Sequence, residues 1–299
     1  MNGVKLFVTG STGQLGRRVI EILVEKNVRV RGGTRHQSKL SSPGPSGVEI
    51  VIADFDRPQT LERAFVGIDR LLLISTPSYS NRFQQHKNAI DAAVKAGVKH
   101  IVYTSFVTAP LKTFRSPHWQ VHNQTEDYIA DSGASFTILR NNLYYEVLPL
   151  MTIGIGAGTW KHAFSEPGRP GQGGIAFVAR EDCASAAASA LSSNSAKNAL
   201  WTITGPAVLT ADEIAAHVSI ARGTLHTAET VTAEELRKEL QMAFAGSATL
   251  REHIDELITF HTQAAASFMS AVTPDVMRLT GQPPMAIEDW IRANKDAFA

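Results

Sequence analysis

Two hydrophobic periods alternate along the first half of the chain. Between short apolar runs, other apolar residues recur at helical spacing; Leu15, Val19 and Leu23, four residues apart, are one example. The run Leu71–Ile74 is apolar without alternation, as expected for a strand covered on both faces. The strand-like runs are Leu6–Val8, Val28–Arg31, Val48–Ile52, Leu71–Ser75, Ile101–Ser105 and Phe136–Leu139. This alternation predicts an α/β fold, a Rossmann-type parallel sheet with helices on both faces.

The pattern changes in the second half of the chain. Residues 151–174 hold many glycines and prolines, which is typical of a mobile connector rather than a core element. The expected helices there are Glu181–Leu191, Ala211–Ala221, Ala233–Phe244, Leu250–Thr262 and Ile287–Ala297, with a strand at Leu200–Thr204. We therefore expect a Rossmann domain of residues 1–142, completed by 175–204. Residues 143–174 and 205–299 would form a smaller, mostly helical C-terminal portion.

Composition narrows the class of protein. The 299 residues include 29 Lys and Arg against 28 Asp and Glu, a balance that argues against chain-wide attraction to nucleic acid or anionic lipid. The single cysteine, Cys183, excludes an intramolecular disulfide framework and lies among alanines typical of a core helix. No apolar run approaches the ~18 residues of a membrane span, and the N-terminus lacks a secretion signal. We expect a cytoplasmic protein without nucleic-acid or membrane partners.

Three glycines follow the first expected strand with the spacing G-x-x-G-x-x-G: Gly10, Gly13 and Gly16. Glycine permits a tight turn and lets the backbone approach a pyrophosphate closely. The N-terminus of the helix that follows would present free N–H groups and a positive dipole end to that anion. A βα turn without a ligand is the alternative, because glycine triplets also occur by chance. The position after the first strand favours a dinucleotide, and no Gly-Lys-Ser/Thr follows as in a P-loop.

The charge around the second expected strand distinguishes the dinucleotides. NAD sites usually carry Asp or Glu at the end of this strand, bound to the ribose 2′-hydroxyl. Residues 26–48 contain no acidic residue, and Arg35 lies just past the strand, where a 2′-phosphate would lie. A guanidinium suits phosphate geometry, although a solvated basic turn is the alternative. The sequence favours NADP(H) over NAD(H).

Common catalytic motifs are absent from the chain. None of the five tyrosines has a lysine four residues later, so the Tyr-x-x-x-Lys pair of many short-chain dehydrogenases is missing. The sequence also lacks a G-x-S-x-G nucleophile elbow and an H-E-x-x-H metal motif. The usual acid of a carbonyl reductase is therefore absent.

Several segments resemble the NmrA-like branch of the atypical short-chain dehydrogenases. They are Val8–Gly16, Ala53–Asp56, Gly97–Ser105, Leu139–Tyr144, Ala179–Ala184 and Trp201–Thr210. Closest in character are bacterial NADPH:quinone oxidoreductases and triphenylmethane dye reductases, which also lack the Tyr/Lys pair. The resemblance implies an NADPH-dependent reductase that transfers hydride to an aromatic electron acceptor such as a quinone or dye.

The resemblance also implies binding positions at the carboxyl ends of the strands, where open α/β sheets bind ligands. The glycine loop would carry the pyrophosphate, Arg35 the 2′-phosphate, and Asp54 with Phe55 the adenine. The cofactor set is Gly10, Thr12, Gly13, Gln14, Leu15, Arg35, Asp54, Phe55, Ser75, Thr76, Pro77 and Ser105. The substrate set is Phe106, Asn141 and Tyr144, with the pocket continuing into the C-terminal helices. An Asx turn or helix cap at Asp54, and strand capping by the Asn/Tyr group, are the alternatives.

A helix is expected to begin at Pro117, and on it His118, His122 and Glu126 share a face because they are four residues apart. The segment Val121–Glu126 resembles the Val-His-x-x-Thr-Glu run of the dye and quinone reductases. His122 is therefore the candidate for substrate orientation or proton donation, since imidazole titrates near neutral pH. A structural histidine is the alternative. The His-x3-His spacing also suits zinc, but no third-ligand motif accompanies it, and we expect no metal.

Two further functions stay open at this point. A non-catalytic NADP-sensing regulator would use the same loop and bind a partner protein. An isomerase or epimerase with transiently used NADP is disfavoured by the missing Tyr/Lys pair. The glycine-rich stretches Gly154–Gly158 and Pro167–Gly174 are candidates for a lid over the site. The helical stretches Ala89–Ala96 and Pro117–Ala130 are candidates for pairing two copies in a homodimer.

Overall fold

The computed structural model divides the chain into two compact units. The described residues are 5–36, 38, 48–77, 81–107, 117–152, 158–165, 173–193 and 197–298. Unit 1 comprises Met1–Asn141, Arg180–Ile203 and Asp275–Gln282, and unit 2 comprises Asn142–Ala179, Thr204–Pro274 and Pro283–Ala299. Within the segment expected to complete the first portion, residues 175–179 thus belong to unit 2. Asp275–Gln282, expected in the smaller portion, belong to unit 1.

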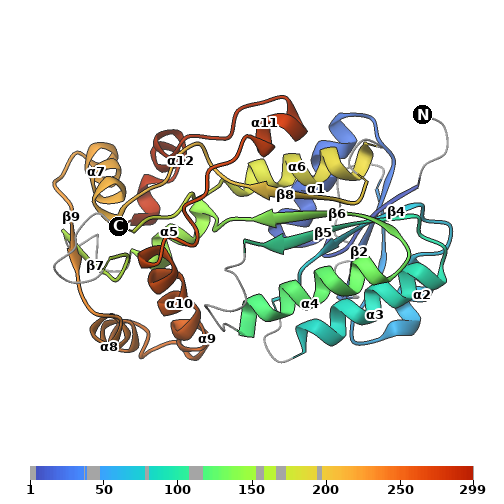
Figure 1. Cartoon of the computed structure of the whole chain (residues 1–299), viewed down its shortest axis with the longest axis horizontal. Coiled ribbons are helices and arrows are strands. Elements are labelled where there is room, and N and C mark those ends of the chain that lie inside the picture. The colour runs from blue at the N-terminus through green and yellow to red at the C-terminus, as the bar shows by residue number, and fades with distance from the viewer. Residues whose placement is uncertain are drawn as a thin grey trace. The chain divides into compact units, whose positions relative to one another are not determined.

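Unit 1 is built on a seven-stranded sheet whose neighbouring strands are all parallel (Figure 1). The strands are β1 (Leu6–Val8), β2 (Val30–Thr34), β3 (Glu49–Ile52), β4 (Arg70–Ile74), β5 (His100–Phe106), β6 (Ser135–Asn141) and β8 (Ala199–Ile203). Their order in the sheet is β3-β2-β1-β4-β5-β6-β8. The chain moves outward from β1 to β3 and then returns to the other side of β1. In open α/β sheets, ligands usually bind in the crevice outside the carboxyl ends of the strands at such a reversal, which here falls between β1 and β4.

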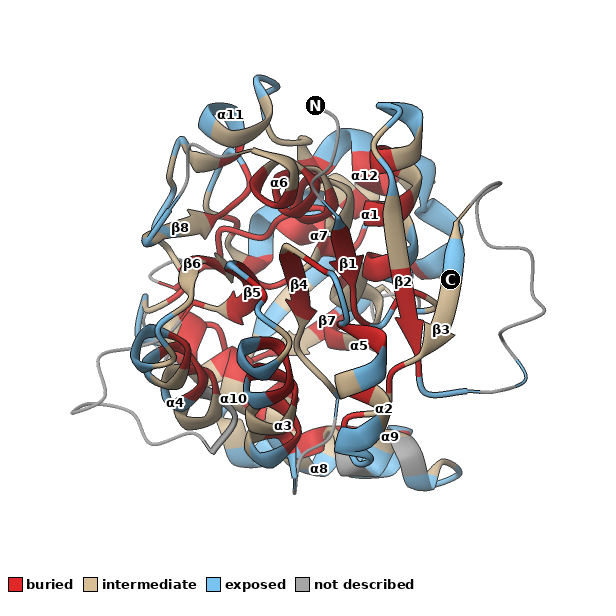
Figure 2. Ribbon diagram, turned by 90° about the vertical axis from the view of Figure 1, so that its right-hand side faces the viewer, coloured by how far each residue is buried: buried red, intermediate tan, exposed pale blue. Residues whose placement is uncertain are grey.

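Helices cover both faces of this sheet, and the expected Rossmann-type arrangement is confirmed. The helices α1, α6 and α11 pack together on one face, and α2, α3 and α4 on the other (Figure 2). They span Gln14–Glu25 (α1), Arg180–Ser192 (α6), Asp275–Thr280 (α11), Pro58–Ala64 (α2), Arg82–Lys95 (α3) and Pro117–Asp131 (α4). The short helix α11 was not expected from the sequence.

The core of unit 1 follows the hydrophobic pattern. Leu71, Leu72 and Leu73 are fully buried, because β4 lies in the middle of the sheet with helices on both faces. The apolar stripe of α1 is buried as well, which places its polar residues outward. The Phe7 and Phe65 rings meet edge to face with their centroids 5.0 Å apart.

Unit 2 is mostly helical, as expected. Its elements are η2 (Tyr145–Val147), α5 (Leu148–Met151), β7 (Thr159–His162), α7 (Ala211–Arg222), β9 (Thr227–Thr230), α8 (Ala233–Ala243), α9 (Ala248–Glu252), α10 (Ile254–Ala265), α12 (Ile287–Ala293) and η4 (Lys295–Phe298). Strands β7 and β9 pair in parallel as a separate two-stranded sheet. The helix expected over Leu250–Thr262 is interrupted at His253 and becomes α9 and α10, and the last helix ends at Ala293.

The interpretation of residues 151–174 as a connector outside the core is wrong for the part that the structure describes. Strand β7 lies inside it, and Trp160 and Phe164 are among the most deeply buried side chains of the chain. Their ring centroids are 5.5 Å apart in an edge-to-face contact. Burial of two large aromatic groups outweighs the turn-forming tendency of the neighbouring glycines and prolines. The proposed lid segments lie largely outside the described residues, at 153–157 and 166–172.

None of the helices in the described ranges is long and apolar enough to cross a bilayer. Nor do three histidine, cysteine or carboxylate side chains gather there in a group that could hold a metal ion. The side chain of His118, named in the zinc alternative, lies outside the described residues.

Candidate functional site

The turn after β1 is held by its own backbone and by β2. Gly10 has a φ of +58°, the left-handed conformation that glycine adopts without strain. The Gly13 N–H donates to the Gly10 carbonyl at 2.9 Å and closes the turn. The backbone N–H and the hydroxyl of Ser11 both donate to the Gly33 carbonyl, each at 3.0 Å. The loop is therefore fixed against the carboxyl end of β2.

Close packing at Gly16 allows only glycine there. A Cβ at this position would lie 2.4 Å from the Gly10 carbonyl oxygen and 2.8 Å from its carbon. Both atoms belong to the backbone, so the clash is relieved only if the loop opens. Gly16 therefore lets the start of α1 lie directly against the loop.

The N-terminus of α1 is arranged for an anion. Gly13 is its N-cap, no side chain caps it, and its first turn holds no acidic residue. Its free N–H groups and positive dipole end therefore face the loop without a competing carboxylate. Gln14 is exposed, whereas the Leu15 side chain is buried and leaves only its backbone to a ligand. The Thr12 hydroxyl lies 3.3 Å from that of Thr34 at the end of β2. These residues fit a dinucleotide pyrophosphate.

Arg35 lies directly after β2 and is exposed. Its Nε donates to His36 Nε2 at 3.1 Å on an exposed turn. The hydrogen bonds from Ser11 to Gly33, two residues earlier, hold this end of β2 next to the glycine loop. A guanidinium in this position suits a 2′-phosphate on the adenosine ribose.

Asp54 and Phe55 follow β3, and their side chains have local roles. The Asp54 carboxylate accepts hydrogen bonds from the Asp56 N–H at 3.1 Å and from Arg57 Nε at 2.8 Å. The Asx turn that was the alternative interpretation of Asp54 is therefore present. The Phe55 side chain is part of the hydrophobic core. Contact of these residues with adenine stays a prediction.

The loop after β4 is tied to its surroundings by three hydrogen bonds. The Ser75 N–H donates to the Thr104 hydroxyl at 3.0 Å, and the Thr76 hydroxyl donates to Gln85 Oε1 at 2.7 Å. The Thr76 N–H donates to His86 Nε2 at 3.2 Å. Pro77, the next residue, is exposed. The loop is thus held at the β4 side of the crevice, where the reactive half of a dinucleotide that spans it would lie.

His122 lies in a buried polar cluster between α3, β5 and α4. Its Nδ1 is 2.8 Å from the Tyr103 hydroxyl, which is 3.5 Å from His86 Nδ1. His86 Nδ1 is also 3.0 Å from the Thr125 hydroxyl. Burial, with a smaller contribution from the Arg82 charge, lowers the pKa of His86 to about 3. Burial also raises the pKa of Tyr103 well above its usual range.

Sequence reasoning missed His86 and Tyr103 as members of this cluster. Tyr103 lies in the segment Gly97–Ser105 that carries the family resemblance but is not among the candidate site residues, and His86 lies in none of those segments. One available signal was Tyr103 itself, a hydroxyl that directly follows the apolar pair Ile101 and Val102 in a central strand. Buried hydroxyls of this kind need a hydrogen-bond partner from a neighbouring element.

An ion pair with a buried carboxylate and a partly exposed guanidinium lies one turn after His122 on α4. Glu126 accepts hydrogen bonds from Arg140 Nε at 3.0 Å and Nη2 at 2.5 Å, and from the Ser105 hydroxyl at 2.5 Å. The hydrogen bonds from Arg140 to the Glu126 carboxylate hold the pKa of Arg140 above its usual value. The Ser105 hydroxyl is thus engaged with α4, and its contact with a cofactor stays a prediction.

The three predicted substrate residues have different surroundings. The Phe106 ring lies 6.2 Å from the His122 ring, measured between centroids. Asn141 is buried, and its carbonyl accepts the Val107 N–H at 3.0 Å. Tyr144 belongs to unit 2, where it forms a bridge with Val178. Phe106 is therefore the predicted substrate residue that the structure places beside His122.

Comparison with known proteins gives consistent matches over the whole fold. The model of the NmrA-like family matches residues 3–283. The NAD(P)H azoreductase of Xenophilus azovorans is 26% identical over 98% of this chain and 99% of its own. Quinone oxidoreductase 2 of Escherichia coli is 34% identical over 72% of this chain and 74% of its own.

Solved structures match over almost the full length. The triphenylmethane reductase of Citrobacter sp., crystallised with NADP(H), superposes with a TM-score of 0.85 at 28% identity, covering 98% of this chain and 99% of that one. The NADPH complex of the quinone oxidoreductase of Escherichia coli gives a TM-score of 0.85 at 27% identity, covering 97% and 99%.

Proposed function

This chain belongs to the NmrA-like family, and from that membership and the geometry of unit 1 we propose that it reduces aromatic acceptors such as quinones or dyes with NADPH. It is an NAD(P)H-dependent oxidoreductase, as its relatives are. The observation that carries the proposal is the glycine loop. The backbone of this loop packs against Gly16, and Arg35 follows the strand to which the loop is hydrogen-bonded. The chain also lacks the Tyr-x-x-x-Lys pair that supplies the acid of many short-chain dehydrogenases.

The residues that would hold the cofactor form two groups, one for its phosphates and one for its nicotinamide half. The loop from Gly10 to Gly16 and the start of α1 would bind the pyrophosphate through backbone N–H groups, and Arg35 the 2′-phosphate. Ser75 and Thr76, after β4, would lie on the nicotinamide side of the crevice. When bound, the reduced nicotinamide supplies the hydride that the acceptor takes up.

The missing acid is consistent with a flat, electron-poor acceptor. A quinone that has gained hydride is a stabilised anion, so a strong protein acid is dispensable. The chain's task is then to hold the acceptor in the reacting geometry and to stabilise the new negative charge. Phe106 would offer an aromatic surface to a flat ring, and His122, whose ring lies beside it, would orient the acceptor or donate a proton.

Cofactor consumption separates a reductase from a regulator that only binds NADPH. We expect loss of the reduced-nicotinamide absorbance when the protein is mixed with NADPH and a benzoquinone, a naphthoquinone, a triphenylmethane dye or an azo dye. The same acceptors with NADH should react more slowly. Tight NADPH binding without consumption in the presence of any of them would contradict the proposal and favour the sensing regulator.

Charge reversal at Arg35 should change the choice of cofactor. Arg35→Glu removes a charged hydrogen-bond donor and places a carboxylate beside the 2′-phosphate. We expect the Kd for NADPH to rise roughly thirtyfold, the equivalent of about 2 kcal/mol, with little change for NADH. Titration of both cofactors measures this.

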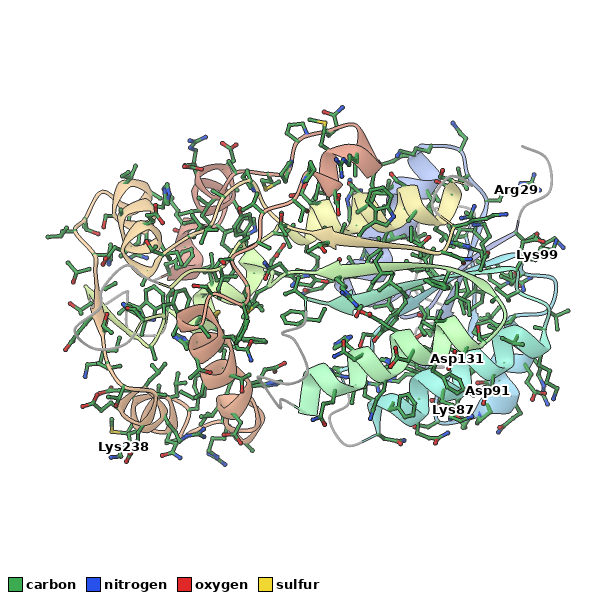
Figure 3. The ribbon with its side chains drawn as sticks, in the orientation of Figure 1. Arg29, Lys87, Asp91, Lys99, Asp131 and Lys238 are labelled. Atoms are coloured by element: carbon green, nitrogen blue, oxygen red, sulfur yellow. The ribbon has the colours of Figure 1, made fainter. Side chains whose placement is uncertain are left out.

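Arg29→Glu is the matched control for this variant. Arg29 precedes β2 and Arg35 follows it, so the same charge is reversed at the other end of one strand (Figure 3). Its Kd values should stay near those of the unaltered protein. Equal weakening of NADPH and NADH by Arg35→Glu would exclude Arg35 as the 2′-phosphate ligand.

Removal of the His122 imidazole should slow turnover. His122→Ala removes the polar group beside Phe106, and we expect kcat to fall about tenfold with little change in the Kd for NADPH. Gln124→Ala, at an exposed position of the same helix, should leave kcat unchanged. Steady-state rates with two acceptors measure the effect, and an unchanged kcat for His122→Ala with both would assign His122 a structural role.

A further inference from the structure

The cluster around His122 constrains where its protons lie. Four side chains meet there from three elements: His86 of α3, Tyr103 of β5, and His122 with Thr125 of α4. All four are buried. Since a backbone N–H can only donate and a carbonyl can only accept, the outer contacts of this cluster determine the direction of the inner hydrogen bonds.

The tautomer of His86 follows from the loop after β4. The Thr76 N–H donates to His86 Nε2, so this nitrogen carries no hydrogen. Because burial lowers its pKa to about 3, His86 is neutral near neutral pH, and its hydrogen is on Nδ1. The Thr125 hydroxyl donates to the Val121 carbonyl at 2.7 Å. Its oxygen is therefore free to accept the hydrogen bond from His86 Nδ1, 3.0 Å away.

The direction of the Tyr103 hydrogen bond follows in turn. Burial raises the pKa of Tyr103, so its hydroxyl keeps the hydrogen. His86 Nδ1 already carries a hydrogen and cannot accept the one from Tyr103. Thr125 does not compete for this bond, because its hydrogen goes to the Val121 carbonyl and its oxygen accepts from His86. Of the two histidine nitrogens near the Tyr103 oxygen, the one that can accept is His122 Nδ1, at 2.8 Å against 3.5 Å for His86 Nδ1.

We propose that Tyr103 and His86 are positioning residues that hold a neutral His122 with its hydrogen on Nε2. The Nε2–H group then serves as a hydrogen-bond donor to the negative charge that hydride addition leaves on a quinone oxygen, while the proton that completes the reduction comes from water. The tautomer follows from the hydrogen bonds of unit 1 alone, whereas its use in catalysis rests on the proposed function. His122 thus orients the acceptor and stabilises its charge, and it does not donate the proton.

Nitrogen NMR tests the tautomer without any variant. The full-length protein, labelled with ¹⁵N at histidine and saturated with NADP⁺, is examined near neutral pH by long-range ¹H–¹⁵N correlation, with His122 assigned from the spectrum of His122→Gln. We expect the shift of an unprotonated nitrogen at Nδ1 and of a protonated nitrogen at Nε2. A hydrogen on Nδ1, or on both nitrogens, would overturn the proposal.

Tyr103→Phe removes the donor while keeping the ring. We expect His122 to become a mixture of its two tautomers and kcat with a quinone acceptor to fall about tenfold, with KM for NADPH unchanged. Tyr128→Phe is the matched control. Tyr128 donates to Asp91 and accepts from Lys87, both on the outer side of α3 (Figure 3). Its loss should change neither the His122 shifts nor kcat.

The two readouts separate this proposal from the proposed function. A fall in kcat for Tyr103→Phe with unchanged His122 shifts would refute the positioning role. Turnover of acceptors by a protein whose His122 carries its hydrogen on Nδ1 would refute positioning and leave the reductase assignment standing. Absence of NADPH consumption would refute the reductase, whereas the NMR shifts would still decide the tautomer.

Discussion

The variant Gly16→Ala is expected to lose tight NADPH binding. The added Cβ would lie 2.4 Å from the Gly10 carbonyl oxygen, and Gly10 is itself in a left-handed turn that leaves little freedom. Relief requires the loop to move away from α1, which separates the N–H groups that bind the pyrophosphate. Overpacking of this kind costs about 3 kcal/mol, which corresponds to a Kd for NADPH more than roughly a hundredfold higher.

Calorimetric titration with NADPH measures this loss, and a urea unfolding curve shows whether the variant is folded. Gly246→Ala is the control, because a Cβ there meets nothing within 4 Å and the residue is exposed. It should bind NADPH as the unaltered protein does. An unchanged Kd for a folded Gly16→Ala protein would mean that the cofactor does not use the loop.

The variant Arg140→Met should lose much of its stability. Glu126 is buried with its carboxylate bound to Arg140 and to the Ser105 hydroxyl. Without the guanidinium, a buried carboxylate keeps only one neutral donor, and breaking such a pair costs about 3 kcal/mol of unfolding free energy. The pair also fastens α4 to β5 and β6, so the position of His122 depends on it.

Urea unfolding of Arg140→Met and of the double variant Glu126→Gln/Arg140→Met measures this effect. The double variant should recover part of the loss, because no buried charge is left without a partner. Arg17→Met is the control, since the Arg17–Glu21 pair is exposed and exposed pairs contribute less than about 1 kcal/mol. Equal stability of Arg140→Met and the unaltered protein would show that the pair does not hold α4.

The periodic part of the fold was predictable from the chain itself. The apolar run at Leu71–Ile74 predicted a central strand, and the stripe at Leu15, Val19 and Leu23 predicted the buried face of α1, because burial selects apolar side chains at the period of each element. The glycine loop was predictable for a similar reason. Only glycine tolerates the contact at Gly16, so the requirement is visible in the residue itself.

Contacts between distant residues were not predictable in this way. His86, Tyr103 and His122 come from three elements, and no local pattern records that their side chains meet. The same holds for Ser105, whose partner Glu126 lies on the next helix. The strand around Trp160 was hidden by the glycines and prolines beside it, although its aromatic side chains indicated burial. Tertiary packing decided each of these cases.

Transfer of deuterium from the cofactor to a dye tests the reductase assignment most directly. The protein is incubated with a triphenylmethane dye and NADPH that carries deuterium at both positions of nicotinamide C4, and the colourless product is analysed by mass spectrometry. We expect deuterium on the central carbon of the reduced dye, formed faster with NADPH than with NADH. Bound NADPH together with unreduced dye, or reduced dye without deuterium, would contradict hydride transfer by this protein.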